Sequence, residues 1–293
     1  MPPCSRFVDS ARRACHAASA HPASTMNTLL PLQPRFFAAL GFKLLVCALA
    51  LAFRVDAAQA APVVAGGTPA GPGAKKILIV TGLDYPGHKW QLTTPVLRDA
   101  VGKDQRMQVT VTEDARVLAS PELKEYDVIL LNYMNWENPG PGKEAQEGLR
   151  KAVEAGTGLV MVHFSCGAFQ DWPEFVKVAG RVWDPKLRPH DPLGSFKVEI
   201  RDKTHPVTAG MEDFETVDEL YTCLTGDAAI KVLASARSMV DHKDYPMAFA
   251  FEYGKGKVFQ SVLGHDVKAL EPEAVRKLFR RACAWAAGLE PNE

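Results

Sequence analysis

Three short runs of apolar residues limit the folds open to this chain more than any other feature. They are ILIVT at 77–81, the apolar part of Asp127–Tyr133, and LVMV at 159–162. A strand that is apolar at every position needs cover on both faces, as in the parallel sheets of α/β proteins. Helical spacing follows the first two runs, in Gln91–Val101 and Lys143–Ala155. This alternation of strand and helix predicts an α/β fold with a mostly parallel central sheet.

The second half of the chain contains more strand candidates. The last two candidates are joined by a tight Gly-Lys-Gly link, and an amphipathic helix closes the chain. The candidate strands are Phe196–Arg201, Ile230–Ala234, Met247–Glu252 and Lys257–Val262, and the helix is Pro272–Ala287. Since no internal repeat interrupts this pattern, we expect one domain over residues 75–290.

Residues 1–60 have the features of an export signal rather than of folded protein. A basic residue precedes the apolar run Phe36–Phe53, and the small residues AQA follow at 58–60. A basic start, an apolar core and a small-residue cleavage site together predict a secretory signal peptide. We expect translation to start at Met26 and cleavage to follow Ala60, which makes the mature chain periplasmic or secreted.

A transmembrane anchor is the alternative interpretation of the same apolar run. A membrane span needs about 20 apolar residues, and Lys43 interrupts this run. We therefore favour a cleaved signal and expect no membrane association after cleavage. The Gly/Pro/Ala-rich residues 61–74 predict a flexible linker between the signal and the domain.

The charge balance argues against a nucleic-acid partner. The chain holds 34 basic and 34 acidic residues, whereas nucleic-acid-binding domains show a basic excess or a basic stripe. After cleavage the cysteines that remain are Cys166, Cys223 and Cys283. An odd number leaves at least one of them unpaired within the chain, and we expect buried thiols.

Polar and aromatic residues follow the apolar strands where each strand ends. Ligands of open α/β sheets bind beyond the carboxyl ends of the strands, so we expect these side chains to meet at one edge. Aromatic planes beside amides suit sugar rings, which stack their C–H faces and hydrogen-bond through their hydroxyls. The candidate substrate-binding residues are Tyr85, His88, Trp90, Asn132 and Trp136.

His163 directly follows the third apolar run, and His265 follows the strand candidate Lys257–Val262. The turn at His163 is comparable to the strand-to-helix elbow that holds a nucleophile in hydrolases. A histidine in this place can act as a base or bind a metal. Cys166 lies three residues later, and its thiol would be a nucleophile only with a base nearby.

A metal site is another use for these side chains. Zinc takes three or four ligands from His, Cys and carboxylates, and His88, His163 and His265 with Asp218 or Glu219 could supply them. No closely spaced ligand motif such as HExxH is present. Adjacent residues diverge on any regular element, so we expect at most one of the two carboxylates to face the site. A divalent metal cofactor is left open.

Several segments together resemble the trehalose-utilization (ThuA-like) family. They are ILIVTGLDYPGHKW, DVILLNYMNWEN, GTGLVMVHFSCGAF, HPVTAG, DELY, GKGKVF and LGHD, spread over residues 75–290. The resemblance implies a flavodoxin-like, class I glutamine amidotransferase-like three-layer sandwich, with a histidine at the elbow where amidotransferases carry cysteine. It also implies a role in disaccharide use through 3-keto-sugar intermediates. Carried over by motif, the site residues are His88, His163, Asp218, Glu219, Tyr221 and His265. The stretch FSCGAF after His163 departs from the family pattern, because it lacks the acidic residue that many relatives carry there.

These observations lead to one hypothesis and two alternatives. The hypothesis is an exported protein that acts on trehalose, another disaccharide or a glycoside by acid–base cleavage of a 3-keto-sugar, as a lyase or hydrolase. His163 or His265 would remove the acidic C2 proton, and Glu219 would protonate the leaving oxygen. Tyr221 or a metal would polarise the carbonyl. The alternatives are a non-catalytic sugar-binding module and an amidohydrolase that uses Cys166; a homo-oligomer is left open.

Overall fold

The computed structural model describes residues 71–292, so the expected signal peptide, the start at Met26 and most of the linker lie outside the described residues. The main sheet consists of β1 (Lys75–Val80), β2 (Met107–Thr112), β3 (Val128–Leu131), β4 (Gly158–Val162), β6 (Gly194–Ile200), β7 (Phe214–Asp218), β9 (Lys231–Arg237), β10 (Asp244–Tyr253) and β11 (Gly256–Ser261). Its strand order is β2-β1-β3-β4-β11-β10-β9-β6-β7. Two short strands, β5 (Val182–Trp183) and β8 (Leu224–Thr225), pair separately.

The main sheet is parallel in one half and antiparallel in the other. β2, β1, β3, β4 and β11 run parallel, and the apolar runs predict this for β1, β3 and β4. β10 pairs antiparallel with β11, and β9, β6 and β7 continue in antiparallel pairs. The change of direction comes from the tight turn at Gly254, whose φ of +60° is accessible to glycine without a steric cost. The fold is therefore α/β with a mixed sheet.

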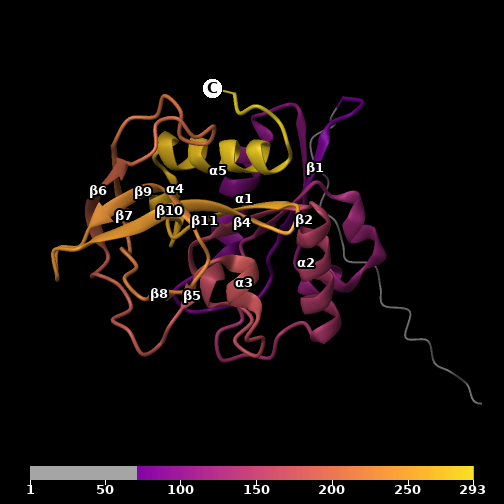
Figure 1. The fold of residues 1–293 in the computed structure, drawn as a ribbon, viewed down its shortest axis with the longest axis horizontal. Helices are drawn as coiled ribbons and strands as arrows, with labels where there is room; N and C mark the ends of the chain where they lie inside the picture. The colour runs from indigo at the N-terminus through magenta and orange to yellow at the C-terminus, as the bar shows by residue number, and fades with distance from the viewer. Residues whose placement is uncertain (1–70, 293) are drawn as a thin grey trace, which may run out of the picture. The chain divides into compact units, whose positions relative to one another are not determined.

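Helices lie on both faces of this sheet. α1 (Trp90–Gly102) and α5 (Glu273–Ala286) lie on one face, and α2 (Lys143–Ala155) and α3 (Phe175–Ala179) lie on the other (Figure 1). The short helix α4 (Val267–Leu270) precedes α5, and the 3-10 helices are η1 (Ala115–Ala119), η2 (Pro121–Glu125) and η3 (His163–Gly167). α2 has the bounds that its sequence predicts, and α1 and α5 differ from theirs by one residue at each end.

The side chains of β1 show why both faces need cover. Ile77 and Ile79 belong to the core that includes α1 and α5, whereas Leu78 and Val80 belong to the core that includes α2 and α3. All four are fully buried, because successive side chains of a strand point to opposite faces. Burying one such aliphatic side chain contributes about 1.5–3 kcal/mol, so the uninterrupted apolar run stabilises two cores at once.

β7 is a strand that the sequence pattern does not predict. Its sequence FETVD alternates in burial, and it lies at one end of the strand order. An edge strand with one solvated face carries fewer apolar residues than a central strand, so its signal is weak. β7 matters here because it ends at Asp218, directly before Glu219.

A substitution at Gly158 tests the packing of β4 against α5. An added Cβ would lie 2.7 Å from the Cβ of Ala286 and 2.8 Å from its carbonyl oxygen. We expect Gly158→Val to push the two elements apart and to lower the free energy of unfolding by about 1–3 kcal/mol, measured by urea denaturation. Gly194→Ala is the control, because its added Cβ would meet only an ordinary contact at 3.5 Å. Equal unfolding midpoints for the two variants would contradict this packing.

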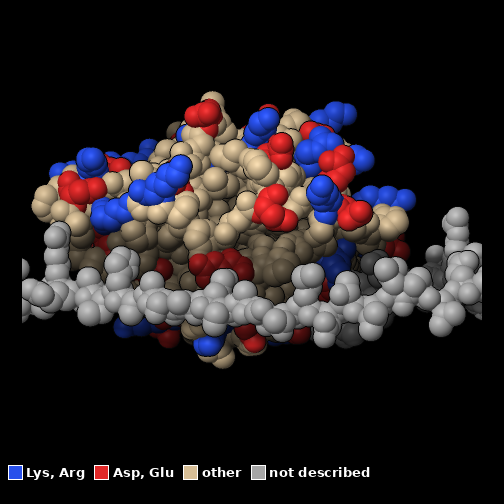
Figure 2. All heavy atoms as spheres, turned by 90° about the horizontal axis from the view of Figure 1, so that it is seen from below, with Lys and Arg blue, Asp and Glu red and all other residues tan. Residues whose placement is uncertain are grey.

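The described surface carries charges of both signs. On the face shown in Figure 2, lysines and arginines are interspersed with aspartates and glutamates. No helix within residues 71–292 is long and apolar enough to cross a membrane. Cys166, Cys223 and Cys283 are buried and free, which confirms the prediction of buried thiols.

Candidate active site

Three histidines that are far apart in the sequence meet at one edge of the parallel half-sheet. His88 lies in the loop after β1, His163 directly after β4, and His265 in the loop after β11. The Nε2 atom of His163 lies 3.1 Å from His88 Nε2 and 3.3 Å from His265 Nδ1. Strands that run parallel end at the same edge, so the structure brings together what the strand-end rule predicts.

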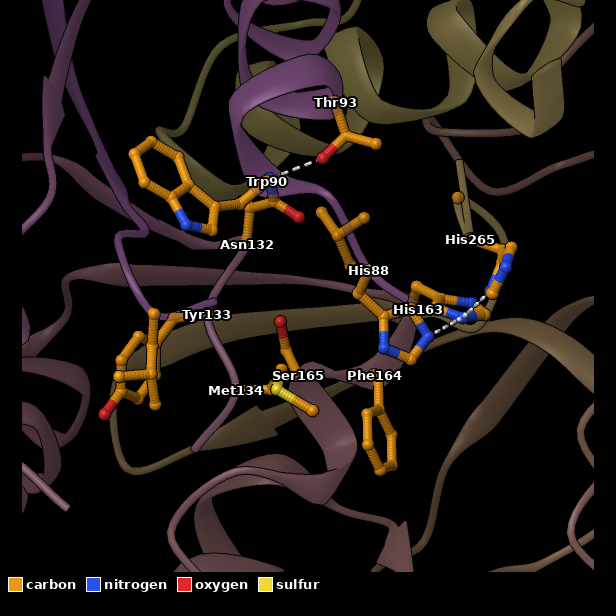
Figure 3. Close-up of a pocket in the computed structure, with 13 residues that line it drawn as sticks. His88, Trp90, Thr93, Asn132, Tyr133, Met134, His163, Phe164, Ser165 and His265 are labelled. Carbon is orange, nitrogen blue, oxygen red and sulfur yellow. Dashed lines mark hydrogen bonds between the residues drawn. The ribbon is translucent and has the colours of Figure 1, made fainter. Parts of the chain in front are cut away.

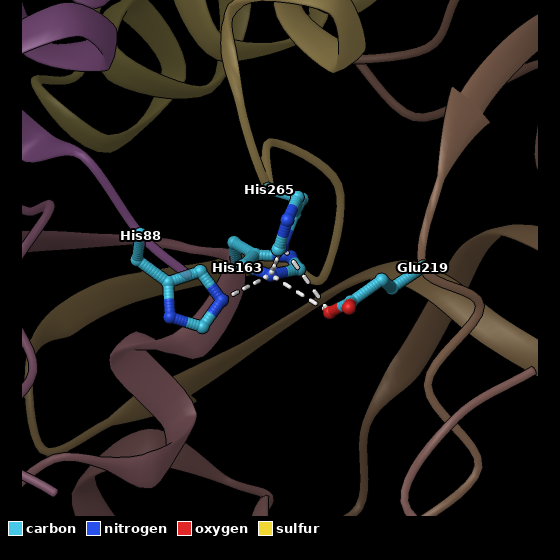
Figure 4. A group of neighbouring side chains, drawn as sticks. All are labelled: His88, His163, Glu219 and His265. Atoms are coloured by element: carbon cyan, nitrogen blue, oxygen red, sulfur yellow. Dashed lines mark hydrogen bonds and ion pairs between the residues drawn. The ribbon is translucent and has the colours of Figure 1, made fainter. Parts of the chain in front are cut away.

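Glu219 and Tyr221 join the histidines from the segment that follows β7. Glu219 Oε2 lies 3.2 Å from His265 Nδ1 and 3.6 Å from His163 Nε2. The hydroxyl of Tyr221 lies 2.7 Å from His163 Nε2. Figure 4 shows His88, His163, His265 and Glu219 pointing toward one another; we name these four residues the histidine–glutamate cluster.

His163 is held in an unusual conformation at the centre of the cluster. Its φ of +47° is rare for a residue with a side chain, and such strain is found where the surrounding structure fixes a functional residue. Its Nδ1 lies 2.7 Å from the carbonyl oxygen of Val262. A carbonyl oxygen only accepts hydrogen bonds, so Nδ1 carries the proton and donates it. In the neutral ring, the Nε2 lone pair therefore points into the cluster.

The environment shifts the pKa values of the other members in different directions. Burial, followed by repulsion from His163 and His265, lowers the pKa of His88 to about 2, which keeps its imidazole neutral. Burial opposes ionisation of Glu219, but hydrogen bonds with His163 and His265 outweigh it and hold the pKa of this carboxyl well below its usual value. The hydrogen bond to Glu219 raises the pKa of His265 against the effect of its burial. At neutral pH the cluster thus contains one carboxylate among imidazoles.

Asp218 has a different environment from Glu219. It is completely buried, and its carboxylate accepts hydrogen bonds from the backbone amides of Gly264 at 2.7 Å, Glu219 at 2.8 Å and His265 at 3.3 Å. Burial raises its pKa against the effect of His163 and these amides. Asp218 therefore ties the loop of His265 to the end of β7, and we assign it as a positioning residue rather than a catalytic one.

The predicted substrate-binding residues lie around the cluster in two groups. Tyr85 stacks on His88 with ring centroids 5.4 Å apart, and Trp90 donates a hydrogen bond of 2.8 Å to Asp84. Asn132 donates to the hydroxyls of Thr93 and Thr94, so its amide is used in holding α1. Trp136 packs on Phe164 with ring centroids 5.5 Å apart, and Phe164 in turn lies 5.1 Å from His88.

Two cavities of very different size adjoin these residues. The first, drawn in Figure 3, is lined by His88, His163 and His265 and has a volume of about 30 Å³, close to the volume of a single water molecule. The second has a volume of about 510 Å³, within the range of about 300–1,000 Å³ of small-molecule sites. Its aromatic lining residues are Trp136, Phe169, Trp172, Phe175 and Trp183.

His190 and Trp183 belong to the site, although the strand-end rule does not find them. His190 Nε2 lies 3.7 Å from Glu219 Oε1, the oxygen opposite to the one that faces His265. Its Nδ1 lies 2.7 Å from the carbonyl of Asp191, so Nε2 faces the carboxylate. The ring of Trp183 lies 6.4 Å from His190 and 5.0 Å from Tyr221. Trp183 ends the two-residue strand β5, and His190 lies between β5 and β6. Neither segment is long enough to show an apolar period in the sequence.

The environment of Cys166 disfavours a thiol nucleophile. Its side chain is buried, with 1% of its surface exposed, and burial raises the pKa of the thiol well above its usual value. The thiolate is the reactive form of cysteine, so a raised pKa disfavours that form. Burial and the raised pKa therefore count against Cys166 as the nucleophile of an amidohydrolase.

Comparison with known proteins identifies the fold. A solved ThuA-like protein from Parabacteroides merdae has a TM-score of 0.66 at 23% identity, with 75% of this chain and 92% of that chain covered. A second one, from Bacteroides uniformis, has a TM-score of 0.56 at 20% identity, with 78% and 98% covered. A β-galactosidase from Bacillus circulans has a TM-score of 0.53 at 14% identity, but the similarity covers only 32% of that enzyme and 75% of this chain.

Similarity at these identities concerns the fold alone, whereas a family model also matches the sequence. A search of curated proteins found no match. The model of the family ThuA, described as trehalose utilisation, matches residues 76–286. That range includes the whole main sheet except Lys75, the first residue of β1, and it includes every member of the histidine–glutamate cluster. The chain therefore belongs to the ThuA family.

Proposed function

We propose that this protein cleaves a carbohydrate substrate, a disaccharide or a glycoside, next to the histidine–glutamate cluster. The observation that carries the proposal is the convergence of the four side chains, whose polar atoms lie within 4.8 Å of one another. The family is described by trehalose utilisation, which supports a sugar as the substrate class. A large aromatic cavity beside the cluster supports it further, because sugar rings stack on aromatic planes.

The geometry favours an acid–base pair other than the one that the sequence suggests. His163 Nε2 already has three polar neighbours within 3.3 Å, so a substrate proton has no free approach to it. Glu219 Oε1 and His190 Nε2 lie 3.7 Å apart, and the His190 side chain is 30% exposed. We assign Glu219 as the base and His190 as the acid.

In a glycoside with a carbonyl at C3, this pair would catalyse an elimination. Glu219 takes the proton from C2, the electrons of the C2–H bond form a C1=C2 double bond, and the C1–O bond breaks. The leaving oxygen takes a proton from His190, which gives an unsaturated 3-keto-sugar and a free alcohol. The C2 proton and the leaving oxygen sit on adjacent carbons, so groups 3.7 Å apart can serve both.

The sugar rings would bind in the larger cavity. Trp183 lines that cavity and also lies 6.4 Å from His190, so a ring stacked on Trp183 can extend its reacting end to Glu219. Gln170 and Asp227, which also line it, can hydrogen-bond sugar hydroxyls. The cavity of about 30 Å³ at the three histidines is too small for a ring.

The test is turnover of a panel of 3-keto-glycosides, including 3-keto-trehalose, by the purified protein. We expect His190→Gln to lower kcat by about 10²- to 10⁴-fold, the usual contribution of one acid–base group. His242→Asn is the matched control, because His242 is exposed and is not a member of the cluster; its kcat should not change. Saturable sugar binding without any product would support the sugar-binding module instead, and equal kcat values for the two variants would remove His190 from the mechanism.

We also propose the finer assignments of fold and location. Helices on both faces of the sheet (Figure 1) support a three-layer sandwich of the class I glutamine amidotransferase-like, flavodoxin-like type.

The basic, apolar and small-residue pattern of residues 1–60 supports export of the protein to the periplasm or beyond. We propose a small-molecule carbohydrate as its partner, and binding to neither nucleic acid nor membrane. Mass spectrometry of the exported chain should show Ala61 at its start, and light scattering would report whether it is a homo-oligomer.

A further inference from the structure

We propose that the histidine–glutamate cluster binds a divalent cation of the zinc class, with His88 Nε2, His163 Nε2, His265 Nδ1 and Glu219 Oε2 as its ligands. The inference goes beyond the proposed sugar chemistry and does not depend on it. Three neutral nitrogens and one carboxylate oxygen form the donor set that Zn²⁺ and its neighbours prefer, whereas Mg²⁺ and Ca²⁺ prefer oxygen ligands alone.

The spacing of the ligand atoms fits a tetrahedral ion. Zinc bonds of about 2.0–2.1 Å place neighbouring tetrahedral ligands about 3.3–3.4 Å apart. The distances to His163 Nε2 are 3.1 Å from His88 Nε2, 3.3 Å from His265 Nδ1 and 3.6 Å from Glu219 Oε2. His265 Nδ1 lies 3.2 Å from Glu219 Oε2. The two remaining pairs join His88 to His265 and to Glu219, and their atoms lie within 4.8 Å of each other. His88 is therefore the ligand that would have to move inward most.

Hydrogen bonding alone does not account for this arrangement. His163 Nε2 has one lone pair, because its Nδ1–H donates to the Val262 carbonyl. Three polar atoms approach that lone pair, from His88, His265 and Tyr221, and one lone pair accepts one good hydrogen bond. A cation among the four ligands would use the lone pairs of all three imidazoles, and the Tyr221 hydroxyl would remain as an outer neighbour.

The surroundings of the cluster fit an ion better than an organic group. The adjoining cavity of about 30 Å³ is lined by all three histidines and has room for one water molecule as a further ligand. His163 already shows the outer hydrogen bond that orients metal-binding histidines, from its second nitrogen to a carbonyl. His88 differs, because its Nδ1 is buried without a hydrogen-bond partner among the described residues. We therefore expect His88 to be the least well oriented ligand and to contribute least to affinity.

The experiment measures metal directly and needs no substrate. The full chain is treated with a chelator, dialysed and titrated with Zn²⁺ by calorimetry, and the bound metal is counted by elemental analysis. We expect one ion per chain, at least 100-fold weaker binding in His163→Ala, and a smaller loss in His88→Ala. Glu219→Gln keeps the shape of the side chain and should also weaken binding, which keeps the test valid if His163→Ala folds poorly. His242→Asn should bind like the wild type.

Two outcomes would overturn the proposal. One is metal content well below one ion per chain after Zn²⁺ is added in excess to folded protein. The other is binding that is equally tight in the wild type, His163→Ala and Glu219→Gln, since the ion would then sit elsewhere. Metal binding without turnover of any 3-keto-glycoside would leave this inference standing and count against the proposed function. Turnover of such a sugar by protein that binds no Zn²⁺ would overturn this inference and leave the proposed function standing.

Discussion

Chelation of the metal-loaded protein is expected to lower the midpoint of its thermal unfolding by roughly 8–16 °C. A ligand at about 1,000 times its Kd stabilises the folded state by about 4 kcal/mol. In a domain of about 150–250 residues, each kcal/mol shifts the midpoint by about 2–4 °C. The effect should be large because the ligands come from four separate segments, after β1, β4, β7 and β11, which the ion would hold together. Circular dichroism with and without chelator measures the shift.

The histidine variant and metal replacement provide the controls for this shift. In His163→Ala, chelator should shift the midpoint much less than in the wild type, because the central ligand is missing and the binding is weaker. Adding Zn²⁺ back to the chelated wild type should restore the original midpoint, whereas Mg²⁺ should not. A midpoint that does not respond to chelator or to Zn²⁺ in the wild type would contradict a metal that bridges these segments.

Substitution of Asp218 by alanine is expected to have the largest effect of any single change on both stability and the site. It would leave the backbone amides of Gly264, Glu219 and His265 without their buried acceptor. An unsatisfied buried polar group costs about 1–3 kcal/mol, so we expect the free energy of unfolding to fall by about 3–5 kcal/mol. Urea denaturation measures it.

Asp266→Ala is the matched control for Asp218, because it changes an aspartate in the loop whose backbone Asp218 holds. Asp266 accepts one hydrogen bond, from the amide of Ala269 at the start of α4, and loss of such a cap costs about 1 kcal/mol. If Asp218 positions the cluster, Asp218→Ala should also weaken Zn²⁺ binding in the protein that remains folded, whereas Asp266→Ala should not. Equal losses of stability and affinity in the two variants would contradict the role of Asp218.

The meeting of the histidines could be predicted because it follows from local rules. The apolar runs that end at Val80, Val162 and Ser261 can be recognised in the sequence, and parallel strands share an edge. His88, His163 and His265 each follow one of these strands, and they therefore lie close together at that edge. The family resemblance adds Glu219 and Tyr221 by motif, but no geometry.

The separate roles of the two acidic neighbours could not be predicted. Asp218 and Glu219 are adjacent, and only the path of the chain after the weakly marked edge strand β7 decides which one faces the imidazoles. His190 reaches Glu219 from a loop, and Trp183 reaches the large cavity from the two-residue strand β5, which no apolar run predicts. Loop paths depend on long-range packing, which leaves no periodic trace in the sequence.

By itself, the sequence determined the class of fold and the edge of the sheet where the three histidines meet, because hydrophobic periodicity and the polar residues that follow each strand are local properties. Only the tertiary structure decided that Glu219 faces the imidazoles while Asp218 holds the backbone, that the Cys166 side chain is buried, and that β10, β9, β6 and β7 pair antiparallel. These outcomes depend on distances of a few ångströms between segments that are far apart in the chain, and those distances are set by how the whole core packs.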